Sequence, residues 1–304
     1  MRGRPDGLLG GGLLQVSDPH FGTEQPGAVD ALVRLVATRR PALVLLSGDL
    51  TQRATVAQFG AVRDFVARLH PVPVLAIPGN HDIPLFDLWS RLRHPYARYE
   101  AALGPVHDHE FRSAGWHLLM LNTTRWWRHK NGEVSAAQLE ATCLRLLDAA
   151  PGALKVVVTH QPVAVPSSHD RKDLLRGAAK AVAAWHAAGA DLILGGHIHL
   201  PCVLPLRPAP RPLWAVQAGT AVSTRVRHGT LNSVTEILAV GGPDGAGRAL
   251  NPASMPGLSG VGPDEAGQRR CIVRYWDWPA GQLEFVPRPD VDLPLASRVL
   301  DPQR

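Results

Sequence analysis

Short apolar runs alternate with segments of helical spacing through the first quarter of the chain. The apolar runs at 13–17, 43–47 and 74–77 end in polar or turn residues, which is typical of buried strands. Two sets of apolar residues between them recur at helical spacing, namely Val29, Leu32, Val33 and Val36, then Phe59, Val62, Val66 and Leu69. This βαβαβ order predicts a largely parallel sheet covered by helices.

The alternation continues more loosely in the rest of the chain. Ser135 and Gln138 occupy the N-cap and N3 positions of a capping box, so a helix is predicted to begin there. Another helix is predicted at 173–188. Further strands are predicted at 116–122, 155–159, 192–194, 213–218 and 272–276, the last two in a second sheet. Residues 241–268 hold 12 glycines or prolines in 28 positions, so we expect one domain over 1–304 with a flexible insertion at about 241–268.

Length and cysteine usage narrow the class of protein. A chain of 304 residues, 45% of them hydrophobic, can bury a sizeable core without disulfides. No window of 18 uncharged apolar residues is present, and the apolar stretch at 8–14 lacks a small-residue cleavage site. We therefore expect neither a transmembrane helix nor a signal peptide. Cys143, Cys202 and Cys271 are odd in number and far apart, which favours a reducing cytoplasm.

The charge balance does not indicate a nucleic-acid partner. The formal net charge is +6, and 28 of the 32 basic residues are arginine. A basic excess can reflect nucleic-acid binding, but no run of basic residues here exceeds two or three. A general compositional bias toward arginine is the favoured interpretation.

Five short polar segments each follow a predicted strand. They are Asp18-Pro19-His20, Gly48-Asp49, Gly79-Asn80-His81-Asp82, Thr159-His160 and Gly195-Gly196-His197-Ile198-His199. In open α/β sheets, ligands bind at the carboxyl ends of the strands, so these segments would deliver their side chains to one edge. Each segment alone is also ordinary turn chemistry, but all five in one chain favour a functional site.

The residue types at this edge favour a metal centre. Imidazole and carboxylate suit Mn, Fe or Zn. Seven candidate ligands are too many for one tetrahedral ion and suit two ions that share a ligand. These candidates are Asp18, His20, Asp49, Asn80, His160, His197 and His199. A carboxylate has two oxygens, so Asp49 or Asp18 is the natural bridge. Two metals about 3.5–4 Å apart serve in-line displacement at phosphorus.

In this ordered set of motifs the sequence resembles the calcineurin-like metallophosphoesterases, over about residues 12–220. The Gly-Asn-His-Asp and Gly-Gly-His-Ile-His motifs resemble those of the bacterial cyclic-nucleotide phosphodiesterase (class III) group. The resemblance implies an α/β fold, a two-sheet αββα sandwich of the metallophosphoesterase type. It also implies two divalent or trivalent metal ions, Mn, Fe or Zn, as cofactors.

The resemblance implies a role for each motif. Asp18, His20 and His199 would hold the first metal, and Asp49 would bridge. The second metal would be held by Asn80, His160 and His197. His81 would face the leaving oxygen instead of binding metal. Asn80, His81 and Arg53 would contact the substrate.

Two positions depart from related branches of that family. The protein-phosphatase branch reads Gly-Asp-x-x-Asp-Arg after the second strand, whereas this chain has Gln52 and Arg53 at the last two positions. Gln52 cannot supply the carboxylate that supports the catalytic His, and whether Asp82 does so stays open. Arg53 is either a phosphate contact or a solvated arginine. Relatives that cleave a UDP-sugar pyrophosphate carry Arg at the position of His81, so His81 favours the general phosphodiesterase type.

These features predict a metal-dependent phosphoric ester hydrolase. We expect it to hydrolyse phosphodiesters, with 3′,5′-cyclic nucleotides as candidates, by in-line attack of a metal-bridging hydroxide. His81 or water would protonate the leaving group, with Arg53 and Asp82 as further catalytic candidates. The alternatives are a phosphomonoesterase, or a nuclease or nucleotide pyrophosphohydrolase of the same fold. The expected partner is a small phosphoester, with no membrane or nucleic acid, and a homodimer stays open.

Two stretches that follow predicted strands are candidates for the wall of the substrate site. Residues 123–132 combine Trp126 and Trp127 with basic side chains, so they either stack a base or form a surface hairpin with one Trp packed inward. Residues 167–176 form either a lid or a solvated helix start. A surface hairpin is favoured for residues 123–132, and a solvated helix start is favoured for residues 167–176.

Overall fold

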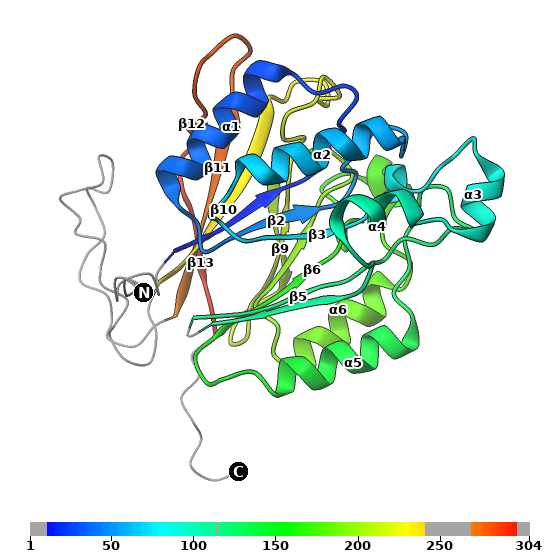
Figure 1. The fold of residues 1–304 in the computed structure, drawn as a ribbon. Coiled ribbons are helices and arrows are strands. Elements are labelled where there is room, and N and C mark those ends of the chain that lie inside the picture. The colour runs from blue at the N-terminus through cyan, green and yellow to red at the C-terminus, as the bar shows by residue number, and fades with distance from the viewer. Residues whose placement is uncertain (1–10, 114, 241–268, 297–304) are drawn as a thin grey trace, which may run out of the picture.

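Two β-sheets pack face to face, and helices cover both outer faces (Figure 1). The computed structural model describes residues 11–113, 115–240 and 269–296. The first sheet has the order β12-β11-β10-β1-β2-β3, with β13 paired to β11, and the second has the order β4-β5-β6-β7-β9-β8. The two-sheet αββα sandwich predicted from the sequence is confirmed.

The strands of the first sheet are β1 (Leu13–Val16), β2 (Leu43–Ser47), β3 (Val74–Ile77), β10 (Asn232–Val240), β11 (Arg270–Trp278), β12 (Val286–Pro287) and β13 (Val291–Pro294). Those of the second are β4 (His109–Arg112), β5 (Trp116–Met120), β6 (Leu154–Val158), β7 (Leu192–Gly195), β8 (Cys202–Arg207) and β9 (Leu213–Gln217). Pairing of β1 with β2 and of β2 with β3 is parallel, as the opening βαβαβ pattern predicts.

One prediction about the sheets is wrong. The strands expected at 213–218 and 272–276 do not share a second sheet, since β9 pairs with β7 and β11 pairs with β10. The reason is β10, a strand that was not predicted from the sequence. It pairs antiparallel with β1, and β11 then returns antiparallel along β10. The chain thus crosses back to the first sheet after β9.

The helices are α1 (Pro26–Arg39), α2 (Val56–Arg68), α3 (Leu88–Arg93), α4 (Ala97–Leu103), α5 (Ala136–Leu147) and α6 (Ala178–Ala187). Ser135 caps α5 as predicted, because its hydroxyl accepts a hydrogen bond from the backbone N–H of Gln138. The helix expected at 173–188 begins later. Residues Ser168–Asp173 form a separate 3₁₀ turn, and Gly177, with a φ of 82°, reverses the backbone directly before α6.

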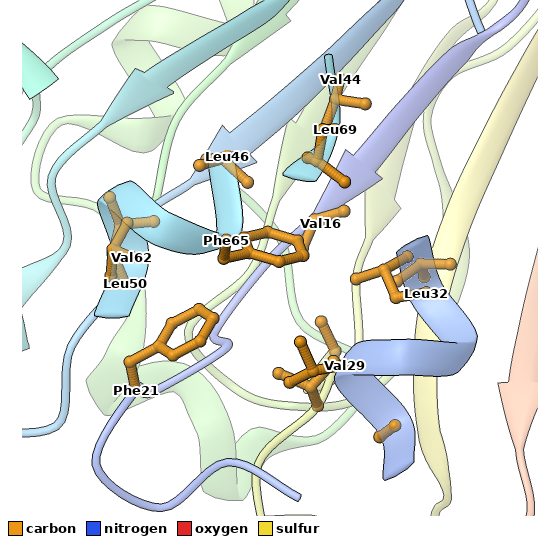
Figure 2. Packing of buried hydrophobic residues seen from close by; sticks show 14 of the residues in the cluster. Val16, Phe21, Val29, Leu32, Val44, Leu46, Leu50, Val62, Phe65 and Leu69 are labelled. Atoms are coloured by element: carbon orange, nitrogen blue, oxygen red, sulfur yellow. The ribbon is translucent and has the colours of Figure 1, made fainter. Parts of the chain in front are cut away.

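Three apolar layers hold these elements together. Figure 2 shows the layer in which Val29 and Leu32 of α1 and Phe65 of α2 pack on Val16 and Leu46 of the first sheet. A second layer fills the space between the two sheets, and a third lies beneath α5 and α6. Burial of this apolar surface fixes the strands, and with them the loops at their carboxyl ends.

Among the described helices, none has the length and apolar character needed to cross a bilayer. The insertion predicted at about 241–268 lies outside the described residues.

Candidate metal centre

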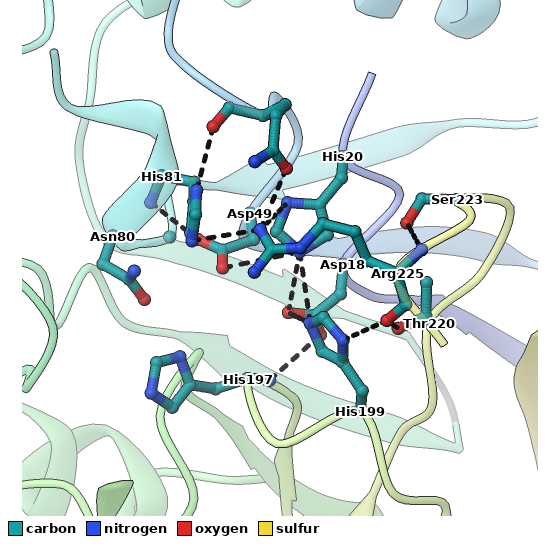
Figure 3. Close-up of polar contacts among 12 residues, drawn as sticks. Asp18, His20, Asp49, Asn80, His81, His197, His199, Thr220, Ser223 and Arg225 are labelled. Atoms are coloured by element: carbon teal, nitrogen blue, oxygen red, sulfur yellow. Dashed lines mark hydrogen bonds and ion pairs between the residues drawn. The ribbon is translucent and has the colours of Figure 1, made fainter. Parts of the chain in front are cut away.

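Loops at the carboxyl ends of five strands meet at one edge of the sandwich. They follow β1, β2 and β3 of the first sheet and β6 and β7 of the second. Each loop carries one of the polar segments singled out in the sequence. The structure brings their seven candidate metal ligands into one continuous cluster, most of which is visible in Figure 3. Both sheets therefore contribute to the cluster.

Asp18, His20 and His199 form the first group of the cluster. Nε2 of His199 lies 3.2 Å from Oδ1 of Asp18 and 3.1 Å from Nε2 of His20. The ligand atoms of all three residues lie within 4.8 Å of one another. One small cation can therefore be reached by all three.

Asp49, His160 and His197 form the second group, again with ligand atoms within 4.8 Å of one another. Nε2 of His160 lies 3.2 Å from Oδ1 of Asp49 and 3.3 Å from Oδ1 of Asn80. The other oxygen of Asp49, Oδ2, lies 3.8 Å from Nε2 of His20 in the first group. One carboxylate thus faces both groups, each with a different oxygen.

The backbone at this edge is strained. Five candidate ligands have a positive φ, namely Asp18 (51°), His20 (44°), Asp49 (50°), His197 (69°) and His199 (54°). A non-glycine residue in such a conformation costs about 1–3 kcal/mol, and such residues concentrate at functional sites. Their side chains converge because the loops turn sharply directly after the strands.

Two glycines allow the loops to approach one another. A Cβ at Gly79 would lie 2.1 Å from the backbone nitrogen of Asp49 and 2.8 Å from Nε2 of His160. A Cβ at Gly196 would lie 2.0 Å from Oγ of Ser17. Any larger residue would force the loops apart, so these glycines are required by packing.

The imidazole rings are oriented by backbone carbonyls. Nδ1 of His160 lies 2.9 Å from the carbonyl oxygen of Ser47, and Nδ1 of His199 lies 2.7 Å from that of Arg225. A carbonyl only accepts, so Nδ1 carries the proton in both rings. When these rings are neutral, the Nε2 lone pairs point into the cluster, as a metal ligand requires.

The ring of His197 gives the most direct sign that the cluster fits metal. Both of its ring nitrogens are buried, and neither has a hydrogen-bond partner among the described residues. A buried imidazole without partners is costly, and a bound cation would satisfy one nitrogen. The donor set of neutral nitrogens, carboxylates and one amide oxygen suits Mn, Fe or Zn.

The electrostatics of the cluster favour the metal-binding forms of Asp49, His20 and His197. Burial raises the pKa of Asp49, but the neighbouring His160 and His81 outweigh burial and hold that pKa well below its usual value. Burial lowers the pKa of His20 to about 3 and that of His197 to about 4. Asp49 is therefore anionic, and His20 and His197 are neutral, at neutral pH, whereas the neighbouring carboxylates outweigh burial and raise the pKa of His160 and of His199.

Asp82 is buried, and within the described part of the chain its carboxylate forms no hydrogen bond or ion pair with the His81 ring. Its carboxylate accepts hydrogen bonds from the backbone N–H groups of Leu50 at 3.0 Å, Thr51 at 2.8 Å and Gly79 at 2.8 Å. It thereby ties the loop after β2 to the loop after β3. These hydrogen bonds go to the backbone and not to the His81 ring, and a catalytic role of Asp82 stays a prediction.

Arg53 does not lie in the cavity in front of the cluster. Its exposed guanidinium stacks over the ring of Phe86, 5.5 Å from the ring centroid. The expectation of a phosphate contact at Arg53 is therefore not met by this geometry. The reason is local, because the backbone N–H of Arg53 is held by Gln58 of the α2 capping box, which directs the side chain outward.

Arg225, and not Arg53, lines the cavity in front of the cluster. It follows β9, and its guanidinium nitrogen Nη1 lies 3.2 Å from Nε2 of His81 and 2.9 Å from Oε1 of Gln52 (Figure 3). No motif in the sequence predicted this role for Arg225. The available signal was its position in a polar segment after the predicted strand at 213–218, like the other five segments.

The cavity in front of the cluster measures about 580 Å³. Lys130, from the 123–132 stretch, contributes to its wall and pairs with Asp173 at 2.5 Å. Trp126 and Trp127 of the same stretch are 38% and 56% exposed, so the expectation of one Trp packed inward is wrong. Asp173 lines the cavity from the 3₁₀ turn that replaces the expected helix start.

The chain is similar in sequence to one known family and to a curated protein. The family profile described as calcineurin-like phosphoesterase matches residues 12–201. A probable cyclic nucleotide phosphodiesterase of Synechococcus sp. is 31% identical over 198 residues, which cover 62% of this chain and 72% of that protein.

Two solved structures share the fold at low sequence identity. A purple acid phosphatase from yellow lupin seeds aligns with 93% of this chain at a TM-score of 0.62 and 10% identity. This chain spans about half of that enzyme, 53%. A dimetal phosphatase from Danio rerio aligns with 93% of this chain and 98% of its own length, at a TM-score of 0.59 and 13% identity. At these identities the likeness concerns the fold alone.

Proposed function

Because the chain belongs to the calcineurin-like phosphoesterase family, and is a metal-dependent phosphoric ester hydrolase, we propose that it hydrolyses phosphodiesters at a dinuclear metal centre. The observation that carries the proposal is the position of Asp49. Its Oδ1 lies 3.2 Å from His160 and its Oδ2 lies 3.8 Å from His20, so one carboxylate is shared by two groups of ligands. Two ions with a common ligand suit displacement at phosphorus.

The proposed ligand sets follow from the two groups. Asp18, His20 and His199 would hold the first ion, and Asp49 would be shared between the two ions. The second ion would be held by His160 and His197, with the amide oxygen of Asn80 beside Nε2 of His160.

The protein side chains position the reaction. Two bound metal ions supply a more acidic water and neutralise charge on the phosphoryl oxygens. His81 is placed by a hydrogen bond from its Nδ1 to the carbonyl oxygen of Gln52 at 2.9 Å, which leaves its Nε2 toward the cavity. From there His81 faces the leaving oxygen and, once Nε2 has taken up a proton from water, can donate that proton as the oxygen departs. The backbone N–H of His81 donates to Oδ1 of Asp49 at 2.8 Å, which couples both residues.

Within phosphodiesters, 3′,5′-cyclic nucleotides are the first candidate substrates. The support is the cyanobacterial relative, whose name refers to cyclic nucleotides, and a cavity of about 580 Å³. Small-molecule sites have volumes of about 300–1,000 Å³, so a mononucleotide suits this cavity. The proposed metals are Mn, Fe or Zn, and the proposed compartment is the cytoplasm, since Cys143, Cys202 and Cys271 are all unpaired.

The test is hydrolysis of bis(p-nitrophenyl) phosphate by metal-stripped protein reloaded with Mn²⁺. p-Nitrophenyl phosphate and 3′,5′-cyclic AMP are assayed in parallel. We expect the diester to be turned over faster than the monoester, and cyclic AMP to be hydrolysed. Turnover of the synthetic diester alone would remove cyclic AMP as a substrate. Preference for the monoester would contradict the phosphodiesterase assignment and support a phosphomonoesterase.

A further inference from the structure

Arg225 is the one lysine or arginine lining the cavity that has no carboxylate partner within the described parts of the chain. Of the other two, Lys130 pairs with Asp173, and Arg227 pairs with both oxygens of Asp170 at 3.1 Å. Those two charges are neutralised by their own partners. The positive charge of Arg225 is left for a ligand of the cavity.

Only one nitrogen of the Arg225 guanidinium, Nη1, makes hydrogen bonds among the described residues. Its Nη1 lies 2.9 Å from Oε1 of Gln52, 3.2 Å from Nε2 of His81 and 3.4 Å from Nδ1 of His20. Two hydrogens on one nitrogen thus face three groups. Nε and Nη2 have no hydrogen-bond partner among the described residues, so three of the five N–H donors are available.

The backbone of Arg225 is fixed directly beside the metal cluster. Its carbonyl oxygen accepts hydrogen bonds from Nδ1 of His199 at 2.7 Å and from the hydroxyl of Thr220 at 3.3 Å. Its own N–H donates to Oγ of Ser223 at 3.0 Å (Figure 3). The half-buried side chain therefore extends from an anchored base into the cavity.

Before a ligand enters the cavity, the guanidinium of Arg225 donates a hydrogen bond to His81. Nδ1 of His81 donates to the carbonyl oxygen of Gln52, so Nε2 carries the lone pair and accepts from Arg225. Nε2 is the atom that has to reach the leaving oxygen. A phosphate oxygen is a stronger acceptor than a neutral imidazole, because hydrogen bonds between two ionised groups are the stronger ones.

We propose that Arg225 is a catalytic residue that binds a non-bridging oxygen of the substrate's phosphoryl group and, in doing so, releases Nε2 of His81. The freed Nε2 then takes up a proton from water in the cavity and donates it to the leaving oxygen. This inference rests on the proposed function. It also specifies the charge of the substrate, because a single unpaired guanidinium matches a phosphodiester monoanion. A polyphosphate would meet walls in which Lys130 and Arg227 are already neutralised.

The test measures binding of inorganic phosphate to Mn²⁺-loaded protein by titration calorimetry, which requires no turnover. Arg225→Ala is compared with Arg63→Ala, a control on the exposed face of α2 whose side chain is 64% exposed. We expect phosphate binding to weaken by about ten- to a hundredfold in Arg225→Ala, the loss typical of a hydrogen bond to a charged group. The control should bind like the wild type. Metal content should be unchanged in both, since the backbone contact to His199 is kept.

A double variant distinguishes direct contact of Arg225 with phosphate from an effect of Arg225 on the position of His81. Arg225→Ala is combined with His81→Ala, and the phosphate affinities of the single and double variants are compared. If Arg225 contacts phosphate itself, its removal weakens binding also in the His81→Ala background. An effect that disappears in that background would overturn the proposal, because Arg225 would then act through His81 alone.

Arg225→Gln covers the case in which Arg225→Ala perturbs the metal centre. Glutamine keeps a polar side chain without the charge, and we expect it to retain metal and to lose phosphate affinity as alanine does. Loss of metal in both variants, or unchanged phosphate affinity in either, would overturn the proposal. If wild-type protein binds phosphate in this Arg225-dependent way but cleaves no diester, the proposed function fails and the role of Arg225 as a phosphate ligand stands.

Discussion

The carboxylate of Asp82 accepts hydrogen bonds from both the backbone N–H of Thr51, at 2.8 Å, and its hydroxyl, at 2.9 Å. Thr51 lies in the loop that carries Asp49, and Asp82 lies in the turn that carries Asn80. This pair therefore sets the distance between a proposed bridging ligand and a proposed ligand of the second ion. Asp82 acts as a clamp between two loops.

Replacement of Asp82 by Asn should lower stability and metal affinity more than it lowers turnover at saturating metal. The new amide group turns a donor toward backbone N–H groups that need an acceptor, at a cost of about 2–4 kcal/mol in unfolding free energy. Urea denaturation and metal titration measure the two effects. A large fall in kcat at full metal occupancy, with normal stability, would instead assign Asp82 to the chemistry.

Replacement of His81 by Ala should lower kcat for a diester by about a hundredfold while both metal ions stay bound. His81 also lies in a group with His20 and Asp49 whose ligand atoms fall within 4.8 Å, so metal content has to be measured together with the rate. The exposed His94 offers a control substitution to Ala. Unchanged turnover would remove His81 from the mechanism, and loss of an ion would make it a ligand.

Replacement of Asp49 by Asn should weaken binding of both metal ions, because its two oxygens face different groups. His199→Ala should weaken mainly the ion held with Asp18 and His20. We expect each affected affinity to fall by at least about a hundredfold. Equilibrium dialysis followed by elemental analysis counts the ions. Equal stoichiometry in the two variants would contradict the bridging role of Asp49.

Replacement of Gly79 by Ala should destabilise the protein by about 1–3 kcal/mol or more, since the new Cβ would lie 2.1 Å from the backbone nitrogen of Asp49. Gly60 in α2 provides the matched control, because a Cβ there meets nothing within 4 Å. Gly60→Ala should stabilise the helix by about 0.5–1 kcal/mol. Thermal denaturation compares the two, and a tolerated Gly79→Ala would show that the loops can separate.

Metal uptake by the metal-free protein should release protons and become tighter as the pH rises toward 9. Burial lowers the pKa of His160, but the nearby Asp49 carboxylate outweighs burial and raises the pKa to about 9. At pH 7 the ring is protonated and has to lose a proton before Nε2 can bind metal. Calorimetry in two buffers of different ionisation enthalpy measures this release, expected to be about one proton from His160.

The same shift affects the stability of the metal-free protein. A raised histidine pKa in the folded state stabilises the protein fully below pH 6.5, and this contribution is lost as the pH rises through about 9.

Absence of proton release on metal uptake, or a metal affinity that falls between pH 7 and 9, would contradict a protonated His160.

Much of the architecture could be predicted from the sequence because it depends on local patterns. Apolar runs of four or five residues predicted β1, β2 and β3 nearly to the residue, and the Ser135 capping box located the start of α5. The five polar segments could be recognised as one site because parallel strands bring their carboxyl ends to a common edge. The sequence by itself therefore determined which side chains come together, and the residue types at each strand end indicated metal chemistry.

Only the tertiary structure decided how those side chains are supported and which charge faces the substrate. The direction of Arg53 depends on the α2 capping box, and the position of Arg225 depends on β9 pairing with β7 before the chain crosses to β10. Arg53 and Gln58 are close in the sequence, whereas the strand pairing that places Arg225 is not visible in a window of neighbouring residues. Strand partners are chosen by packing of distant segments, so a side chain more than 140 positions from His81 could be assigned to the site only from the folded chain.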